Sequence, residues 1–427
     1  MQKLKSKLLN KKFTAGIIGL GYIGLPLFLE LFQKKINVYG FDINPKILSN
    51  LKKKKSHITE ISNEQLTKTN KNRFINLLNS PMKIKECDVI IFCLPTPIKK
   101  NKKPDMDYII NAFQNIKKYL RKEQMIILES TVYPGATEDI FLKFIKKNFN
   151  IGKDFYLSYS PERVDPGTKR KFKFRDITKV VSGYTQNCLF NSRYFYSLIF
   201  KNIFVADSIR VAEFAKCFEN TYRSININLV NQMKIISQKI GLDFFHIIDV
   251  AKSKPFGFVP FLPGPGIGGH CIPIDPLFIS WIAKKQKVSS SLIDAADKIN
   301  LKMPEWIFKK IAKKIKKTEK ILILGITYKK DVNDLRESSA IKLFKLFKDN
   351  KYNIFYYDPY ITSFKIKNFT FKRIKNFKYN ILKKFKNVIL LTDHSSFNYN
   401  EILKYSNVLY DTRGVYYRSK KNKVISC

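Results

Sequence analysis

Histidine, tryptophan and acidic side chains are scarce in this chain of 427 residues. It has 4 histidines, 2 tryptophans and 34 Asp and Glu residues against 79 Lys and Arg residues. Its six cysteines show no CxxC pair and no other metal-ligand spacing; they are Cys87, Cys93, Cys188, Cys217, Cys271 and Cys427. So few ligand side chains argue against a zinc site, and scattered cysteines are typical of reduced thiols. We therefore expect a cytoplasmic protein without a metal ion.

Long apolar runs are also missing. No stretch of eighteen apolar residues occurs, so we expect no insertion into a membrane. The basic residues 1–12 and the apolar residues after them imitate a secretory signal. Three regularly spaced glycines and the lack of a small-residue cleavage site favour a strand, a turn and a helix instead. At this length one hydrophobic core is not enough, and two or three domains are expected.

The net charge of +45 raises the alternative of a nucleic-acid-binding protein. The lysines, however, are spread through every segment and form no stripe. They accompany many Asn, Ile, Phe and Tyr residues, the mixture that an A+T-rich coding sequence produces. We expect no nucleic-acid partner, although a basic surface attracts polyanionic substrates such as nucleotides.

A dinucleotide-binding pattern opens the chain. The apolar run 13–18 predicts a strand, 25–32 predicts a helix, and GxGxxG lies between them. In this pattern the first glycine makes a tight turn, the second admits a pyrophosphate and the third lets the helix pack on the strand. A second strand, 37–41, ends at Asp42, whose carboxylate suits an adenosine ribose and favours NAD over NADP. The predicted cofactor residues here are Gly19, Gly21, Tyr22, Ile23, Gly24 and Asp42.

Further strands are predicted at 89–94, 125–129 and 155–159, separated by helical patterns. This alternation predicts a parallel, doubly wound sheet whose ligand site lies at the carboxyl ends of the strands. Those ends carry LPTP (94–97), ESTVYPG (129–135) and SPERVDPG (160–167). Pro, Gly, Ser and Thr follow many strands simply as turn residues. Three such loops at one edge nevertheless favour a functional site.

A long helical stretch without proline runs from about residue 206 to Pro255. Lys216 and Asn220 are four residues apart, so they share one face of this helix. From periodicity alone, a lysine beside apolar positions favours an ordinary surface residue.

Residues 263–276, PGPGIGGHCIPIDP, combine four glycines with prolines around Cys271. Such a backbone is bent and open to close approach by a ligand. Asp275 follows four residues later, so a thiol and a carboxylate could face one pocket. The alternative is a surface turn with an incidental cysteine.

A second βα alternation occupies the last third, with strands at 321–325, 353–358, 387–394 and 407–414 and a helix at 338–346. Its first turn offers Lys329, Lys330 and Arg336 before a helix, which suits a phosphate ligand other than a second NAD. The alternative is a charged surface loop. We predict an α/β fold with two Rossmann-like doubly wound domains joined by a central helical domain. The predicted boundaries are 1–203 for the NAD domain, 204–303 for the helical domain and 304–427 for the second Rossmann-like domain.

Taken together, these motifs resemble the UDP-glucose/GDP-mannose dehydrogenase family over essentially the whole chain. The matching segments are GLGYIGLP, LPTP, ESTVYPGATE, SPERVDPG, AEFAKCFENTYRSININLVNQ, PGPGIGGHCIPIDP and GITYKKDVNDLRESSA. Within the family the loop and SPERVDPG look most like the branch that oxidises UDP-N-acetylglucosamine or a close N-acetylhexosamine relative. Ile274 stands where UDP-glucose enzymes of the family have a lysine, which weakens a UDP-glucose assignment and removes one cofactor contact.

The resemblance implies an NAD-dependent, four-electron oxidation of a UDP-sugar at C6, for surface polysaccharide biosynthesis. It implies that Cys271 captures the intermediate aldehyde, with the other catalytic residues being Lys216, Asn220, Asp275, Thr131 and Glu162. It adds Pro95, Thr96, Thr131 and Arg336 to the cofactor contacts. The implied substrate contacts are Glu162, Arg163, Lys216, Asn220, Phe261, Gly268 and Lys329. It further implies a homodimer, or a higher homo-oligomer, through the central helix.

Two other functions remain open on the residues alone. A two-electron β-hydroxyacid dehydrogenase shares the fold but has no use for a cysteine nucleophile. A basic nucleic-acid-binding or regulatory protein that retains an NAD fold would show salt-sensitive binding to DNA and no turnover of nucleotide sugars. UDP-glucose, UDP-N-acetylgalactosamine and UDP-N-acetylmannosamine remain alternative substrates within the family.

Overall fold

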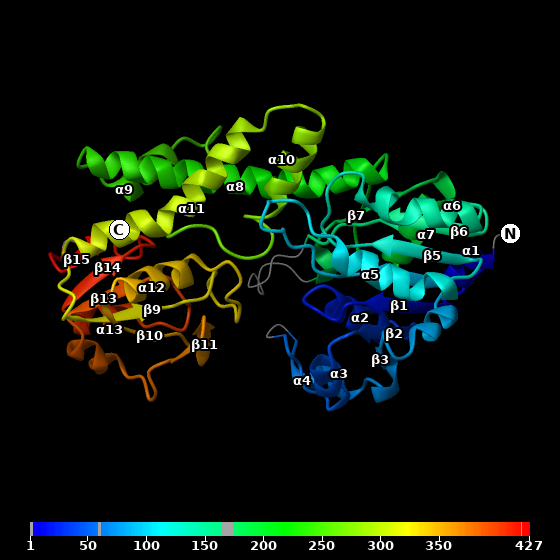
Figure 1. Ribbon diagram of the computed structural model, residues 1–427, viewed down its shortest axis with the longest axis horizontal. Coiled ribbons are helices and arrows are strands. Elements are labelled where there is room, and N and C mark those ends of the chain that lie inside the picture. The colour runs from blue at the N-terminus through cyan, green and yellow to red at the C-terminus, as the bar shows by residue number, and fades with distance from the viewer. Residues whose placement is uncertain (1–2, 59–60, 164–173, 420) are drawn as a thin grey trace. The chain divides into compact units, whose positions relative to one another are not determined.

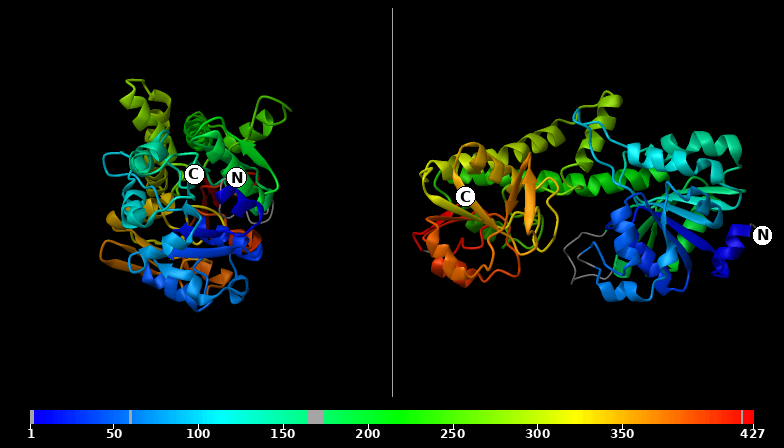
Figure 2. Two further views of the ribbon diagram at one scale, coloured as in Figure 1. Left: turned by 90° about the vertical axis from the view of Figure 1, so that its right-hand side faces the viewer. Right: turned by 60° about the horizontal axis from the view of Figure 1, so that its bottom comes forward.

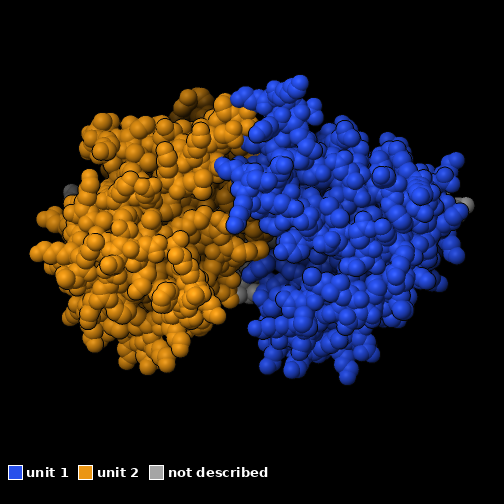
Figure 3. All heavy atoms as spheres, viewed as in Figure 1, with its two compact units in different colours: residues 1–219, 277–289 blue, residues 220–276, 290–427 orange. Residues whose placement is uncertain are grey.

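The computed structural model describes residues 3–58, 61–163, 174–419 and 421–427. The chain divides into two compact units (Figure 3). The N-terminal unit comprises residues 1–219 and 277–289, and the C-terminal unit comprises residues 220–276 and 290–427. The division into three domains stays a prediction, and residues 164–167 of SPERVDPG lie outside the described residues.

The N-terminal unit is built on an eight-stranded sheet in the order β3-β2-β1-β4-β5-β6-β7-β8 (Figure 1). Its strands are β1 Thr14–Ile18, β2 Asn37–Asp42, β3 Phe74–Asn76, β4 Val89–Phe92, β5 Gln124–Leu128, β6 Phe155–Tyr159, β7 Lys179–Gly183 and β8 Ile203–Val205. Its helices are α1 Lys3–Leu9, α2 Gly24–Gln33, α3 Pro45–Lys52, α4 Asn63–Thr67, α5 Asp107–Ile116, α6 Lys143–Asn148 and α7 Gln186–Ser197.

Helices cover both faces of this sheet. Alternate strand residues point to opposite faces, and one set, including Ile17, Ile91 and Ile127, joins a buried core with α1, α2 and α7. On the other face Phe92 packs against Phe141, which in turn meets Phe113 of α5. The doubly wound α/β architecture expected from the sequence is therefore confirmed.

The sequence predicts a parallel sheet, but one pair of strands in the N-terminal sheet is antiparallel. Strand β7 was not predicted, and it pairs antiparallel with β6, with Ser158 opposite Gly183. Parallel neighbours need a long crossover, usually a helix. The described residues between β6 and β7 contain only one short helical turn, Phe174–Asp176, and β7 runs back along β6.

The C-terminal unit contains a five-stranded parallel sheet in the order β10-β9-β13-β14-β15. Its strands are β9 Lys320–Leu324, β10 Asn353–Tyr357, β13 Asn387–Leu390, β14 Val408–Asp411 and β15 Val424–Ser426, and β11 Ser363–Ile366 pairs with β12 Phe369–Lys372. Its helices are α9 Phe244–Ala251, α11 Ser291–Ala312, α12 Ser339–Asp349 and α13 Tyr399–Tyr405. Helices α11 and α12 cover one face and α13 the other, which is again a doubly wound plan.

Two helices run from one unit into the other. Helix α8, Ile209–Lys239, is a single helix of 31 residues (Figures 1 and 2), and α10 covers Asp275–Lys285. The stretch predicted as helical from 206 to 255 thus consists of α8 and α9, with the break at residues 240–243 around Gly241, whose φ is +78°.

Candidate active site

The glycine-rich turn between β1 and α2 is shaped to receive a dinucleotide. Gly19 has φ +94°, which favours glycine, and its N–H donates to the Phe41 carbonyl at 2.8 Å. A Cβ on Gly24 would lie 1.9 Å from the Gly19 carbonyl oxygen, so helix and turn pack too closely for any side chain. A Cβ on Gly21 would meet nothing within 4 Å. The second glycine therefore faces open space where a pyrophosphate can approach, and the turn fits NAD.

Asp42 ends β2 beside this turn. Its Oδ2 accepts the Leu20 N–H at 3.0 Å and its Oδ1 accepts the Asn44 N–H at 2.8 Å. These bonds orient the carboxylate, and each oxygen keeps a lone pair for a ribose hydroxyl. Tyr22 and Ile23 are half-buried in the turn just before α2.

The loops after β4 and β5 are joined by hydrogen bonds. The Thr96 hydroxyl donates to the Thr131 carbonyl at 2.6 Å, and the Leu94 N–H donates to the Ser130 hydroxyl at 2.9 Å. Pro95 is exposed between them. The structure thus brings two of the predicted cofactor loops together at the carboxyl edge of the sheet.

The loop after β6 is held by a buried charged cluster that the sequence did not reveal. Lys179 Nζ lies 3.3 Å from Glu129 Oε2 and 3.3 Å from Glu162 Oε2. The Tyr196 hydroxyl donates to the other oxygen of Glu129. Burial lowers the pKa of Lys179, but the attraction of the two carboxylates outweighs it and the pKa is raised. Lys179 is thus a permanent cation that keeps Glu162 in place.

A second buried carboxylate, Glu213 of α8, binds the ESTVYPGATE loop. It accepts hydrogen bonds from the Gly135 N–H at 2.5 Å, the Thr137 N–H at 2.9 Å and the Thr137 hydroxyl at 2.6 Å. Burial raises the pKa of Glu213 to about 7, and these hydrogen bonds oppose the shift. Glu213 therefore fixes the beginning of α8 against the loop that carries Thr131.

Lys216 and Asn220 lie on the buried face of α8, at 9% and 4% exposure. The expectation from periodicity that Lys216 is an ordinary surface residue is wrong. The helix is turned so that its polar face is inside, and its buried polar residues are Glu213, Lys216, Asn220, Thr221, Ser224, Asn228, Asn231, Lys234 and Ser237. Burying a lysine is costly without polar partners, so this orientation points to a function of the polar face.

The cysteine loop of the C-terminal unit is fixed at three points. Gly264 N–H donates to Asn231 Oδ1 at 2.9 Å, Ile267 N–H donates to Asn300 Oδ1 at 2.6 Å, and Gly269 N–H donates to the Arg336 carbonyl at 2.9 Å. Gly266 and Gly269 have φ +122° and +86°, as a sharply bent loop requires. The loop is therefore a defined structure and not a loose surface turn.

Cys271 lies in this loop, four residues before the first residue of α10, Asp275. Its carbonyl accepts the Asp275 N–H at 2.8 Å, which makes the first turn of the helix. Asp275 is 2% exposed, and its Oδ2 accepts a hydrogen bond from Asn220 Nδ2 at 2.6 Å. Cys271 is half-buried, whereas the other five cysteines are buried. A partly accessible thiol four residues before a buried carboxylate that is bound to an amide suits covalent catalysis.

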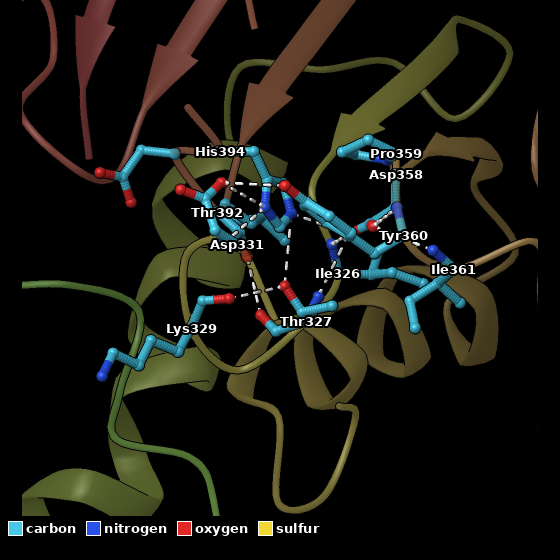
Figure 4. Close-up of polar contacts among 12 residues, drawn as sticks. Ile326, Thr327, Lys329, Asp331, Asp358, Pro359, Tyr360, Ile361, Thr392 and His394 are labelled. Atoms are coloured by element: carbon cyan, nitrogen blue, oxygen red, sulfur yellow. Dashed lines mark hydrogen bonds and ion pairs between the residues drawn. The ribbon is translucent and has the colours of Figure 1, made fainter. Parts of the chain in front are cut away.

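Four more predicted residues lie in the C-terminal unit. Arg336 makes a two-pronged ion pair with Asp334, with its Nη2 2.6 Å from Oδ2. Phe261 packs edge-on against Tyr222, with ring centroids 6.0 Å apart. A Cβ on Gly268 would lie 2.6 Å from Tyr328 Cβ, and Lys329 extends its ammonium away from the strand ends (Figure 4).

The predicted catalytic residues are divided between the units. Thr131, Glu162 and Lys216 belong to the N-terminal unit, as does Arg163, which pairs with Glu219 at 2.7 Å. Asn220, Cys271 and Asp275 belong to the C-terminal unit. Lys179, Glu129 and Glu213 were missed because nothing in their local sequence distinguishes a buried charge from a surface one.

The described residues contain neither a cluster of metal ligands nor a membrane-spanning helix. Among them, no group of three or more His, Cys, Asp or Glu side chains is placed to hold a metal ion. In the same part of the chain, no helix is long and apolar enough to cross a membrane.

Three family models cover most of the chain. The NAD binding domain of the UDP-glucose/GDP-mannose dehydrogenase family matches residues 13–199, its central domain matches 210–302 and its UDP binding domain matches 322–418. The match therefore assigns NAD binding to the domain at residues 13–199 and UDP binding to the domain at residues 322–418.

Individual proteins agree with this match. The chain is 34% identical to the UDP-N-acetyl-D-glucosamine 6-dehydrogenase of Pseudomonas aeruginosa over 83% of its own length and 84% of that protein's. It is 36% identical to the UDP-N-acetyl-D-mannosamine dehydrogenase of Methanocaldococcus jannaschii, over 85% and 83%. The solved UDP-N-acetyl-mannosamine dehydrogenase of Staphylococcus aureus superposes with a TM-score of 0.79 at 29% identity, covering 97% of this chain and 96% of that one. The chain belongs to the UDP-glucose/GDP-mannose dehydrogenase family and is an NAD-dependent nucleotide-sugar 6-dehydrogenase.

Proposed function

We propose that this enzyme oxidises a UDP-N-acetylhexosamine, UDP-N-acetylglucosamine in the first place, at C6 to the uronic acid through covalent intermediates on Cys271. The observation that carries the proposal is the cysteine loop. Its half-buried thiol lies four residues before Asp275, whose carboxylate is bound to Asn220 in a buried pair. A two-electron dehydrogenase has no use for this arrangement.

Each residue has a defined task in the proposed reaction. NAD, when bound, supplies the hydride acceptor for both oxidation steps. Cys271 holds the aldehyde as a thiohemiacetal and then as a thioester, which water hydrolyses to the acid. Lys216 and Asn220, one turn apart on α8, stabilise the oxyanion, and one such donor contributes about 3 kcal/mol. Asp275, Thr131 and Glu162 orient the water and transfer its proton.

The proposed cofactor and substrate contacts follow the two units. In the N-terminal unit, the glycine turn, Asp42, Thr96 and Thr131 contact NAD, and Arg163 with Glu162 faces the sugar nucleotide. In the C-terminal unit, Lys329 contacts substrate phosphate and Arg336 contacts cofactor phosphate. Arg336 is held ready by Asp334, because a paired guanidinium keeps a fixed orientation for phosphate.

The choice of an N-acetylhexosamine rests on Ile274 and on the relatives. UDP-glucose enzymes of the family have a lysine where this chain has Ile274. The positive charge of that lysine is therefore missing here, which argues against UDP-glucose as the substrate. Relatives named for N-acetylglucosamine and for N-acetylmannosamine match at similar identity, 34% and 36%. UDP-N-acetylmannosamine is therefore the second candidate substrate.

A panel of sugar nucleotides tests the substrate. We expect NADH formation with UDP-N-acetylglucosamine at a kcat/KM at least about 10-fold above that with UDP-glucose, since one acetamido group in a fitted pocket contributes about this factor. UDP-N-acetylmannosamine, UDP-N-acetylgalactosamine and GDP-mannose complete the panel. The ratio of NADH to sugar consumed should be two. A strong preference for UDP-glucose would refute the branch assignment, and a ratio of one would refute the four-electron reaction.

The outward face of α8 supports a homodimer. Exposed apolar side chains recur along it at spacings of three, four or seven residues, and they are Val211, Phe214, Phe218, Tyr222, Leu229, Met233 and Ile236, with Ile240 directly after its end. Phe218 is 60% and Ile240 67% exposed. An apolar stripe of this length is typical of a protein interface. We propose that a second copy of the chain covers it, because a straight, self-complementary stripe suits a two-fold axis.

Charge placed in the stripe should separate the two copies. We expect the wild type to sediment at about twice the 50.0 kDa chain mass, and Leu229→Glu to sediment as a monomer, because the dimer would bury an unpaired carboxylate. Lys345→Glu, at an exposed position of α12, is the control and should stay dimeric. A wild-type monomer, or a dimer of Leu229→Glu at the same concentration, would contradict the proposal.

The proposal places the enzyme in the cytoplasm, where NAD and sugar nucleotides are made and where thiols stay reduced. All six cysteines are free in the structure, which a reducing compartment allows. The acidic sugar nucleotide produced is a glycosyl donor, and we propose that it enters surface polysaccharide biosynthesis.

A further inference from the structure

A buried polar cluster lies at the carboxyl ends of β9, β10 and β13, centred on His394 (Figure 4). His394 and Asp358 are both fully buried. His394 Nδ1 accepts the Asp331 N–H at 3.1 Å, and its Nε2 lies 3.1 Å from Asp358 Oδ2. Because Nδ1 accepts, the ring proton is on Nε2 and is donated to Asp358. Burial raises the pKa of Asp358, but His394 and the Ile326 and Tyr360 N–H groups outweigh it and the pKa is lowered.

The cluster holds the beginning of the loop 326–338. Asp358 Oδ2 also accepts the Ile326 N–H at 2.8 Å, and the Thr392 hydroxyl donates to the Thr327 carbonyl at 2.7 Å. Beyond the histidine, Asp331 accepts hydrogen bonds from Ser395, from its N–H at 2.8 Å and its hydroxyl at 2.6 Å. Side chains from the ends of two strands thus bind the backbone of a loop that follows a third. Figure 4 shows that Lys329 in this loop directs its ammonium away from the cluster.

The opposite side of the same loop supports the cysteine loop. The Arg336 carbonyl accepts the Gly269 N–H at 2.9 Å. Added Cβ atoms on Gly268 and Gly269 would lie 2.6 Å and 2.7 Å from Tyr328, so the two loops are in direct backbone-to-side-chain contact. Cys271 follows two residues later. A displacement of Tyr328 would therefore be transmitted to the thiol.

The position of the cluster in the sheet fits a role in holding the loop 326–338 in place. The strand order reverses between β9 and β13, and in open α/β sheets the ligand crevice opens at such a switch point. Thr327 and His394 follow those two strands. The cluster is therefore below the nucleotide-binding edge, and contacts within it decide where the loop above it lies.

We propose that His394 is a positioning residue: with Asp358 and Thr392 it fixes the loop 326–338 against Gly268 and Gly269, and so sets the positions of Lys329 and Cys271. The inference rests on the proposed function for the roles of Lys329 and Cys271. The contact between the two loops does not depend on that function.

Two threonines provide a matched test. Thr392 and Thr412 are both fully buried, and each hydroxyl donates one hydrogen bond of 2.7 Å to a backbone carbonyl, that of Thr327 for Thr392 and that of Leu390 for Thr412. Valine replaces either without a change of shape. Only Thr392→Val releases the loop. We expect it to raise the KM for the UDP-sugar at least about fivefold, as the loss of one buried hydrogen bond can, whereas Thr412→Val should keep this KM within about twofold of the wild type.

A second readout needs no substrate. Cys271 is the one cysteine that is not buried, so its alkylation by iodoacetamide can be followed on the intact protein by mass. Thr392→Val should alkylate at least about threefold faster than the wild type because the loop opens more often, and Thr412→Val should match the wild type.

Two histidine variants distinguish positioning from stability. The Asn oxygen of His394→Asn replaces Nδ1 as acceptor for the Asp331 N–H, whereas the amide of His394→Gln replaces only the donor to Asp358. We expect His394→Asn to keep the alkylation rate and the KM within about threefold of the wild type, and His394→Gln to raise both at least about fivefold, although both lower the Tm.

Equal effects of the two threonine variants, or of the two histidine variants, on alkylation and KM would overturn the inference. If the wild type turns over no UDP-sugar, the proposed function fails, and the alkylation rates alone still decide the inference.

Discussion

Replacing Cys271 by alanine is expected to abolish formation of the uronic acid, lowering its rate at least about 10³-fold, as removal of a covalent nucleophile does. In the proposed mechanism the thiol holds the aldehyde between the two oxidations, and no other described cysteine is exposed enough to replace it. NAD binding should be unchanged, because the glycine turn is in the N-terminal unit. Acid is measured by chromatography and NAD affinity by fluorescence titration.

Two variants accompany this experiment. Cys271→Ser keeps a hydroxyl but is a far weaker nucleophile, and it should also fail to release acid. Cys87→Ala removes a buried thiol before β4, at the opposite end of the strand from the cofactor loops, and should keep normal turnover. Acid formation by Cys271→Ala within about 10-fold of the wild type would refute the covalent mechanism.

Replacing Lys179 by methionine is expected to destabilise the protein by about 3–5 kcal/mol, the usual cost of removing one partner from a buried charged cluster. Glu129 and Glu162 would then be two buried carboxylates without a cation. Glu162 would also lose its position, so kcat should fall together with stability. Chemical denaturation measures the first effect and steady-state kinetics the second.

The pH dependence of the free energy of unfolding shows whether the loss of the Lys179 charge causes the lower stability of Lys179→Met. The pKa of Lys179 is raised in the folded protein. The stability that Lys179 contributes is therefore fully present below the pKa of an unfolded lysine, about 10.4, and is lost only as the pH rises through the higher folded pKa. In the wild type, burial raises the pKa of Glu129. Without Lys179, both carboxylates are destabilising when ionised, so the deficit of the variant should be larger at pH 8 than at pH 5.

A surface lysine provides the matched control. Lys309→Met removes the exposed pair with Glu305 on α11 and should cost less than about 1 kcal/mol at either pH. A deficit for Lys179→Met that equals the one for Lys309→Met, or that does not change with pH, would show that the cluster is not charged as described.

Much of the N-terminal half could be predicted from local sequence. A glycine pattern between a strand and a helix has one geometric solution, and the φ of Gly19 and the contact between Gly24 and Gly19 match it. The cofactor class followed from it and is confirmed. Strand β8 escaped prediction because it has only three residues. Strand β7 has five, and its antiparallel pairing with β6 is decided by neighbours far along the chain.

The orientation of α8 could not be predicted. Its apolar spacing indicates an amphipathic helix, and such helices normally bury the apolar face. Here the polar face is inside with Lys216 and Asn220, and Phe218 is outside. The spacing of apolar residues alone does not say which face of a helix is covered, because the rest of the chain decides which face it packs against.

The sequence by itself determined the family, the NAD turn and the loop around Cys271, because these depend on glycine conformations and residue types within a few positions of one another. The tertiary structure alone decided that Lys179 binds Glu162, that Asn220 binds Asp275 and that His394 supports the loop beside Gly268. These partners are 17, 55 and more than 60 residues apart. Only the packing of strands and helices that are distant in the sequence brings these side chains together, and burial then determines which of the charged ones stay ionised.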